Sequence, residues 1–147
     1  MNPTENLKAS GSLRVVLTGA DGKVKEEHDF KNLVVTVGKN FVASRMVGTA
    51  SNVMSHMAIG SSSTAAAAGD TALGTELGRV ALASATATTN VVTYTATFPA
   101  GTGTGAVVEA GIFNASSAGT MLCRTVFAVV NKGVDDAMSI TWTVTIS

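Results

Sequence analysis

The segment "AMSITWTVTIS", Ala137 to Ser147, has the strictest period-two pattern in the chain. Neighbouring side chains of a strand point to opposite faces of a sheet, and β-branched residues suit a half-buried face. The segment therefore predicts an antiparallel strand with one buried face, on which Trp142 is a core anchor. The apolar positions and the small or hydroxylated ones alternate throughout: Met138, Ile140, Trp142, Val144 and Ile146 against Ala137, Ser139, Thr141, Thr143 and Thr145.

Several segments upstream have a similar strand character and are separated by polar or glycine-rich turns. They are "SHMAIGS", "RVALASATA", "NVVTYTATF", "AVVEAGIF" and "MLCRTVFAVV". "RVALASATA" and "NVVTYTATF" are expected to form a hairpin around residues 88–90, and Phe113 is expected to be a second core anchor. Short strands at regular spacing with glycine turns favour an all-β fold, an antiparallel β-sandwich or jelly-roll-like domain.

The N-terminal third predicts an arm, a hairpin and the one helix. Residues 1–12, "MNPTENLKASGS", are expected to be a flexible polar arm, and residues 13–147 a single domain. "LRVVLT" and "VKEEHDF" flank Asp21-Gly22, a strong hairpin signal. Charge on the returning strand indicates an edge position. From Lys39 to Val47 the pattern leaves period two and predicts a short helix that ends at Gly48.

Charge is scarce in this chain of 147 residues. Charged residues make up 14%, against roughly 25% in typical soluble domains. Ten basic and ten acidic residues give a formal net charge of zero, which favours association. No basic patch interleaves with aromatic residues, so nucleic-acid binding is not expected. No apolar run has the length of a membrane span, and no secretory signal is recognisable, so assembly in the cytoplasm is expected.

The patterns that could indicate an enzyme are weak. "GTGTGA", Gly101 to Ala106, follows a proline and precedes a strand, so a hairpin tip fits it better than a dinucleotide site. His28 and His56 lie far apart, without close-spaced metal ligands or a nucleophile elbow. Cys123 stands in an apolar run and is expected to be a buried small hydrophobe. No catalytic residue, metal, cofactor or small-molecule substrate is therefore expected.

The segment "MAIGSSSTAAAAGDTALGTELGR", Met57 to Arg79, places Asp70, Glu76 and Arg79 close together in a region poor in charge. Asp70 can bond nearby backbone and tighten a turn. Glu76 and Arg79 can pair locally, while Arg79 can equally face Glu109 or a carboxylate of a neighbouring subunit. The four residues are interpreted as pinning a long loop or as a subunit contact. Glycoside hydrolysis by Glu76 and Glu109 is disfavoured, because only 5% of the residues are aromatic.

The order of these segments resembles a family of small structural proteins of tailed bacteriophages. The resemblance covers residues 31–146, from "KNLVVTVGKNFVASRMVG" through "VVEAGIF" to "SITWTVTI". The matching positions are Asn32, Gly38, Gly60, Asp70, Thr71, Leu73, Glu76, Arg79, Glu109, Ala110, Gly111, Phe113 and Trp142.

The resemblance implies a role in the virion and no enzymatic activity. A capsid cement (decoration) protein on the capsid surface is the first expectation, with the major capsid protein and copies of itself as partners. The alternative is a tail-fibre or tail-tip module that contributes to host attachment through the loops at residues 101–105 and 114–120. A hydrolase, the third hypothesis, would lose activity on Glu76→Gln or Glu109→Gln.

Overall fold

The structure is a computed structural model that describes residues 6–49 and 51–147. Within these residues the chain is all-β with one short helix, as its sequence predicts. The elements are β1 (Ala9–Thr18), β2 (Val24–Val34), α1 (Thr36–Arg45), β3 (His56–Gly60), β4 (Glu76–Ala81), β5 (Ser84–Thr88), β6 (Val91–Phe98), β7 (Gly105–Phe113), β8 (Met121–Lys132) and β9 (Ala137–Ile146).

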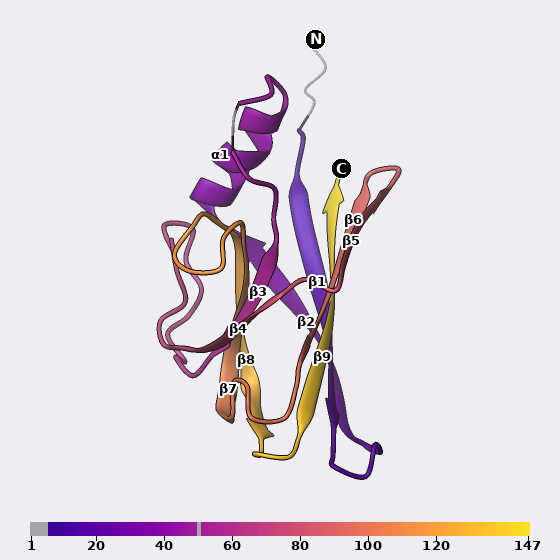
Figure 1. Ribbon diagram of the computed structural model, residues 1–147. Coiled ribbons are helices and arrows are strands. Elements are labelled where there is room, and N and C mark those ends of the chain that lie inside the picture. Colours follow the sequence, from indigo (N-terminus) through magenta and orange to yellow (C-terminus); the bar gives the residue numbers. More distant parts are fainter. Residues whose placement is uncertain (1–5, 50) are drawn as a thin grey trace.

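All nine strands belong to one antiparallel sheet, in the order β4-β3-β7-β8-β2-β1-β9-β6-β5. Only two residue pairs, Leu33 with Arg124 and Val34 with Cys123, join β2 to β8 in its middle. The sheet curls about this narrow junction (Figure 1), so that a "β7 half" (β4, β3, β7, β8) faces a "β9 half" (β2, β1, β9, β6, β5). This is one curled sheet, and the expected sandwich or jelly roll is not confirmed.

The main core lies between the two halves. Trp142 on β9 and Leu13 on β1 pack there with residues of the β7 half such as Met57 and Ile112. Trp142 is fully buried, in the position that the alternation in its strand predicts.

A second apolar cluster lies on the outer face of the β7 half. Phe113 belongs to this cluster and not to the main core, together with Val35, Ala58, Leu73 and Met121. Leu73 comes from the long loop of residues 61–75 between β3 and β4. The outer face of the β7 half is therefore covered by the chain's own loop.

The N-terminal residues differ from the expected arm. Ala9 to Ser12 are the start of β1 and pair with Ile146 to Thr143 of β9. The backbone N–H of Lys8 also donates to the carbonyl of Ser147, at 2.6 Å. Residues 9–12 are thus part of the sheet, because β9 offers them backbone partners. Residues 1–5 of the predicted arm lie outside the described residues.

The β1–β2 hairpin turns at Asp21-Gly22 as predicted, with Gly22 at φ +80°. Its predicted edge position is wrong, because β1 pairs with β9 and β2 continues to β8. Two of the charges on the outward face of β2 are instead paired within the sheet. Arg14 on β1 contacts Glu27 at 2.6 Å and Asp29 at 3.2 Å.

The helix begins three residues before its predicted start and ends at Arg45. A Cβ at Gly38 would collide with the carbonyl of Leu122 on β8, so the close approach of helix and strand requires glycine. Gly48, at φ +66°, follows the last helical turn. No described helix has the length and apolarity to cross a lipid bilayer.

The segment "RVALASATA" is not one strand. It divides into β4, which ends at Ala81, and β5, which begins at Ser84, and these two are the opposite edges of the sheet. The N–H of Leu82 donates to Ser55 at 2.9 Å, and that of Ala83 donates to Thr95 at 2.7 Å. Two residues therefore cross between the edges. The expected hairpin partner of "NVVTYTATF" is β5 alone.

Candidate functional site

A buried carboxylate lies under the loop of residues 61–75. Glu109 on β7 is fully buried, on the outer face of the β7 half. One oxygen, Oε2, accepts the backbone N–H groups of Ser62 at 2.8 Å and Thr75 at 2.9 Å. The other, Oε1, accepts the N–H of Gly74 at 2.8 Å. Both ends of the loop are therefore held by one side chain.

Arg124 on β8 pairs with this carboxylate and extends the network. Its Nε and Nη2 each lie 3.1 Å from Oε1 of Glu109. Nη1 donates to Asp70 at 2.9 Å, and Nη2 also donates to the carbonyl of Thr64 at 2.9 Å. Asp70 in turn accepts the N–H of Ala67 at 2.9 Å. The network thus reaches the middle of the loop as well as its ends.

Arg79 forms the expected local pair but holds a different loop from the one predicted. It pairs with Glu76, with Nη2 2.7 Å from Oε1, which is the local pairing considered above. Its Nη1 donates to the carbonyls of Ala115 at 3.0 Å and Ala118 at 2.9 Å, and its Cζ lies 3.8 Å from the ring centroid of Phe113. Arg79 therefore fixes the turn of residues 114–120. The possible Arg79–Glu109 pair is not formed, because Glu109 is bound by Arg124.

The charged groups of the cluster are engaged in contacts within the chain. The carboxylate of Glu109 is enclosed by five donors and is closed to solvent. The two histidines are engaged elsewhere: His28 contacts Glu26 at 3.2 Å, and His56 contacts Ser55 at 2.8 Å. Among the described residues, no group of three or more His, Cys, Asp or Glu side chains could hold a metal ion. The arrangement is suited to holding a loop.

Arg124 was not singled out from the sequence, although a signal for it exists. It is the one charged residue in the apolar run "TMLCRTVF", as Glu109 is in "AVVEAGIF". Charged side chains in apolar strands are rarely buried unless they are paired. In the β7–β8 register, Glu109 lies opposite Val126 and Arg124 lies opposite Gly111. Glu109 and Arg124 are therefore diagonal neighbours on adjacent strands.

Lys132 forms a second buried polar site that sequence reasoning missed. Its Nζ donates to the carbonyls of Pro99 at 2.9 Å and Asp136 at 2.6 Å. Burial lowers the pKa of Lys132, while the nearby Asp136 opposes this shift. The pKa of Asp136 is lowered by the Gly133 N–H and by Lys25, whose Nζ lies 3.0 Å away. This site joins the β8–β9 turn to β2.

Cys123 is fully buried, and burial raises the pKa of its thiol well above the usual value. A protonated, enclosed thiol is a poor nucleophile. Cys123 therefore acts as the small hydrophobic residue that its surroundings in the sequence indicate.

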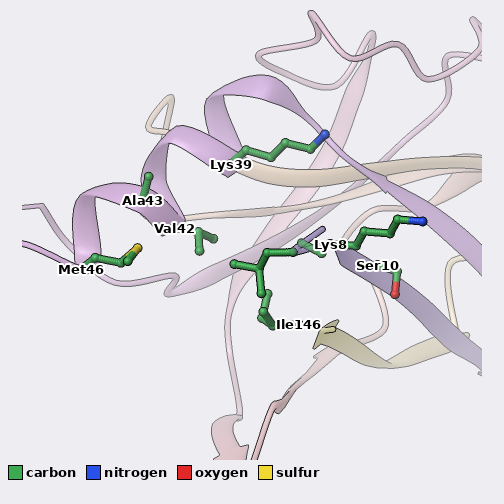
Figure 2. Close-up of a pocket in the computed structure, with 9 residues that line it drawn as sticks. Lys8, Ser10, Lys39, Val42, Ala43, Met46 and Ile146 are labelled. Atoms are coloured by element: carbon green, nitrogen blue, oxygen red, sulfur yellow. The ribbon is translucent and has the colours of Figure 1, made fainter. Parts of the chain in front are cut away.

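A groove of about 470 Å³ lies between α1 and the adjoining ends of β1 and β9. Figure 2 shows Val42 of the helix and Met46, which follows its last residue, on one side and Ile146 on the other. The ammonium groups of Lys8 and Lys39 flank this apolar surface, and no acidic side chain of residues 6–49 or 51–147 lines it. The groove is suited to an apolar segment that carries negative charge.

The outer face of the β9 half carries rows of hydroxyl groups. Strands β5, β6 and β9 contain no charged residue. Hydroxyls of neighbouring strands pair directly, as in Thr97 with Ser139 and Ser12 with Thr143, each at 3.1 Å. No loop among the described residues packs a hydrophobic cluster on this face.

No protein-family model, curated protein or solved structure matches the chain.

Proposed function

We propose that the chain is a structural protein of a tailed-phage virion, a capsid cement protein that stabilises the head shell by bridging major capsid proteins. The segment order over residues 31–146 supports the virion role. The observation that carries the proposal is the uncharged hydroxyl face of β5, β6 and β9. The buried charged groups of the same chain contact its own loops.

An uncharged face of this kind suits a contact surface. Burying an ion costs far more than burying a hydroxyl that finds a new partner, so threonine and serine can be covered at little cost. A fold whose loops are fixed beforehand also loses less conformational entropy on binding. The Glu109–Arg124–Asp70 network provides this rigidity for the loop of residues 61–75.

The groove beside α1 is the proposed contact for the capsid protein. Leu7 and Met46 are exposed there, at 78% and 83%, next to Lys8 and Lys39. The complementary segment of the shell is apolar and carries Asp or Glu side chains. Such pairing fixes the orientation of docking and accelerates encounter. Copies on a lattice would multiply contacts that are individually weak.

Immunogold electron microscopy of intact virions, with an antibody against this chain, tests the proposal. Label spread over the head is the expected result. Label confined to the tail would contradict cement and favour the tail-fibre or tail-tip role, with the loops at residues 101–105 and 114–120 as receptor contacts. Label absent from the particle would contradict both.

A binding assay on purified shells tests the groove itself. Lys39→Glu should reduce cosedimentation with shells, because it places negative charge where an acidic partner docks. Lys23→Glu, in the β1–β2 turn, is the matched control and should bind like the parent. Equal binding by both variants would exclude the groove as the contact.

A further inference from the structure

The two edges of the sheet differ in how closely other segments of the chain pack on them. At the β4 edge, Gly78 lies so close to the backbone of Gly103 that a Cβ would reach its amide nitrogen at 2.9 Å. The loop of residues 99–104 thus packs on the face of β4 at that edge. At the other edge, all five residues of β5, Ser84 to Thr88, are exposed. Figure 1 shows the β5–β6 hairpin on the opposite side of the molecule from the loop of residues 61–75.

The β5 edge also lacks the features that normally block strand addition. Native edge strands commonly carry charged side chains, proline or a bulge. The sequence of β5 is "SATAT", without charge or proline, and it pairs regularly with β6 from Ser84–Thr95 to Thr88–Val91. An exposed edge of this kind is a template for another strand.

The register of the hairpin defines which backbone groups are free. Thr88 and Val91 flank a two-residue turn in which Thr89 has φ +55°. The residues that close such a turn form a hydrogen-bonded pair, and the pairs alternate along the ladder. The backbone groups of Ser84, Thr86 and Thr88 therefore point to β6. Those of Ala85 and Ala87 point away from the sheet, where no described strand pairs with them.

We infer that β5 pairs with β5 of a second copy of this chain, antiparallel, about a two-fold axis at Thr86. In this register Ala85 and Ala87 of opposite copies exchange N–H···O=C bonds. Thr86 lies opposite Thr86, and Ser84 lies opposite Thr88. The strand is symmetric about its centre, with alanine on both sides and a hydroxyl residue at both ends, so each position meets an equivalent one, as a two-fold contact requires.

The proposed contact extends an arrangement that the sheet already has. The hydroxyl groups of Ser84 and Thr95 form a hydrogen bond of 2.5 Å, and those of Thr97 and Ser139 form one of 3.1 Å. Pairing of Thr86 with its copy continues these rows, and such cross-strand pairs stabilise a sheet. Both surfaces are uncharged, so no repulsion opposes their approach. A five-residue edge buries much less than the roughly 1,600 Å² of a standard interface, so free copies should associate weakly.

Disulfide trapping of Thr86→Cys in the purified chain tests the register. Positions directly opposite in a non-hydrogen-bonded pair have Cα atoms about 4.5 Å apart, within disulfide range. Native Cys123 is fully buried. Under mild oxidation, Thr86→Cys should therefore give a reducible dimer, whereas Thr97→Cys on the same face should stay monomeric. Equal crosslinking of both variants, or none at Thr86→Cys, would overturn the inference.

Charge pairing provides an independent readout. Thr86→Lys and Thr86→Glu should each weaken self-association, by up to about fivefold for like charges placed directly opposite. Mixing the two variants should restore it, because the unlike charges then meet on the axis. Sedimentation velocity distinguishes these cases, with thermal melts to show that each variant is folded. A mixture that associates no better than either variant alone would refute the two-fold register.

This inference deepens the self-association within the proposed function, yet its test does not depend on it. The crosslinking uses the isolated chain, whereas the immunogold label reports position in the particle. The two experiments therefore distinguish a failure of the β5–β5 contact from a failure of the proposed virion role.

Discussion

Replacing Glu109 by glutamine removes one charge from the network under the loop and leaves the shape of the side chain unchanged. All five partners of the carboxylate are donors: three backbone N–H groups and two nitrogens of Arg124. The new amide has a single oxygen acceptor, so its NH₂ group must face donors in either orientation. One orientation leaves the N–H groups of Ser62 and Thr75 unpaired. The other leaves Gly74 and Arg124 without their acceptor.

The cost follows from these unpaired groups. Each buried donor without a partner costs about 1–3 kcal/mol, and breaking a buried ion pair from one side costs about 3–5 kcal/mol. These two estimates describe the same loss and are not additive. We expect Glu109→Gln to lower the free energy of unfolding by about 3–5 kcal/mol, or the Tm by roughly 6–20 °C for a domain of this size.

Denaturant unfolding measures the total, and hydrogen exchange locates it. The amides of Ser62, Gly74 and Thr75 should lose protection before the strands of the β9 half do. Glu76→Gln is the control, because its partly exposed pair with Arg79 should contribute less than about 1 kcal/mol. If Glu109→Gln were as mild as this control, the network would not be what holds the loop.

Three further predictions concern other parts of the fold. Trp142→Ala should lower the free energy of unfolding, measured with denaturant, by about 3–5 kcal/mol. Trp142→Phe should lower it much less, because the buried indole N–H has no partner among the described groups. A Trp142→Ala variant that melts like the parent would refute the core position. Arg79→Ala should speed amide exchange in the turn of residues 114–120 and cost about 1.5–3 kcal/mol, because two carbonyls lose a charged donor; unchanged exchange and assembly would contradict its role. Burial raises the pKa of Tyr94 from 10.0 to about 12, so the folded state favours the neutral phenol. The stability that the folded state gains from the neutral Tyr94 phenol is complete below pH 10 and is lost as the pH rises toward about 12. Tyr94→Phe should therefore flatten the alkaline loss of stability in denaturant titrations, and an unchanged slope would refute this assignment.

The elements that local sequence determines could be predicted from the sequence. Strand β9 follows from strict alternation, the β1–β2 turn from Asp21-Gly22, and the helix from a change of period before Gly48. In each case the signal lies within a few residues, because side-chain period and turn conformation are local properties.

The placement of elements in the sheet could not be predicted in this way. Nothing within "RVALASATA" shows that residues 82–83 cross from one sheet edge to the other, because the crossing depends on partners at Ser55 and Thr95. The central place of the charged β1–β2 hairpin depends similarly on β9. The single curled sheet results from these long-range pairings.

The candidate site was predictable in part. Asp70 and Glu109 were singled out as loop-holding residues, and Glu76–Arg79 as a local pair. Their partner Arg124 was not, although two opposite charges in neighbouring apolar strands indicate a buried pair. Whether any of the four residues contacts a second subunit stays a prediction.

The distribution of charge separates the groups that hold the fold from the proposed contact surface. Buried or partly buried charged groups make contacts within the chain in two places. Under the loop of the β7 half they are Asp70, Glu109 and Arg124, and in the β8–β9 turn they are Lys132 and Asp136. Strands β5, β6 and β9 carry none. A charge introduced on their exposed hydroxyl face, as in Thr86→Lys, meets no buried partner and should leave the fold intact while it opposes association. Removing the charge of Glu109 should instead destabilise the fold, beginning with the loop of residues 61–75, and leave association unchanged. If both kinds of substitution affected stability and assembly equally, fold and contact surface would not be separate parts of this molecule.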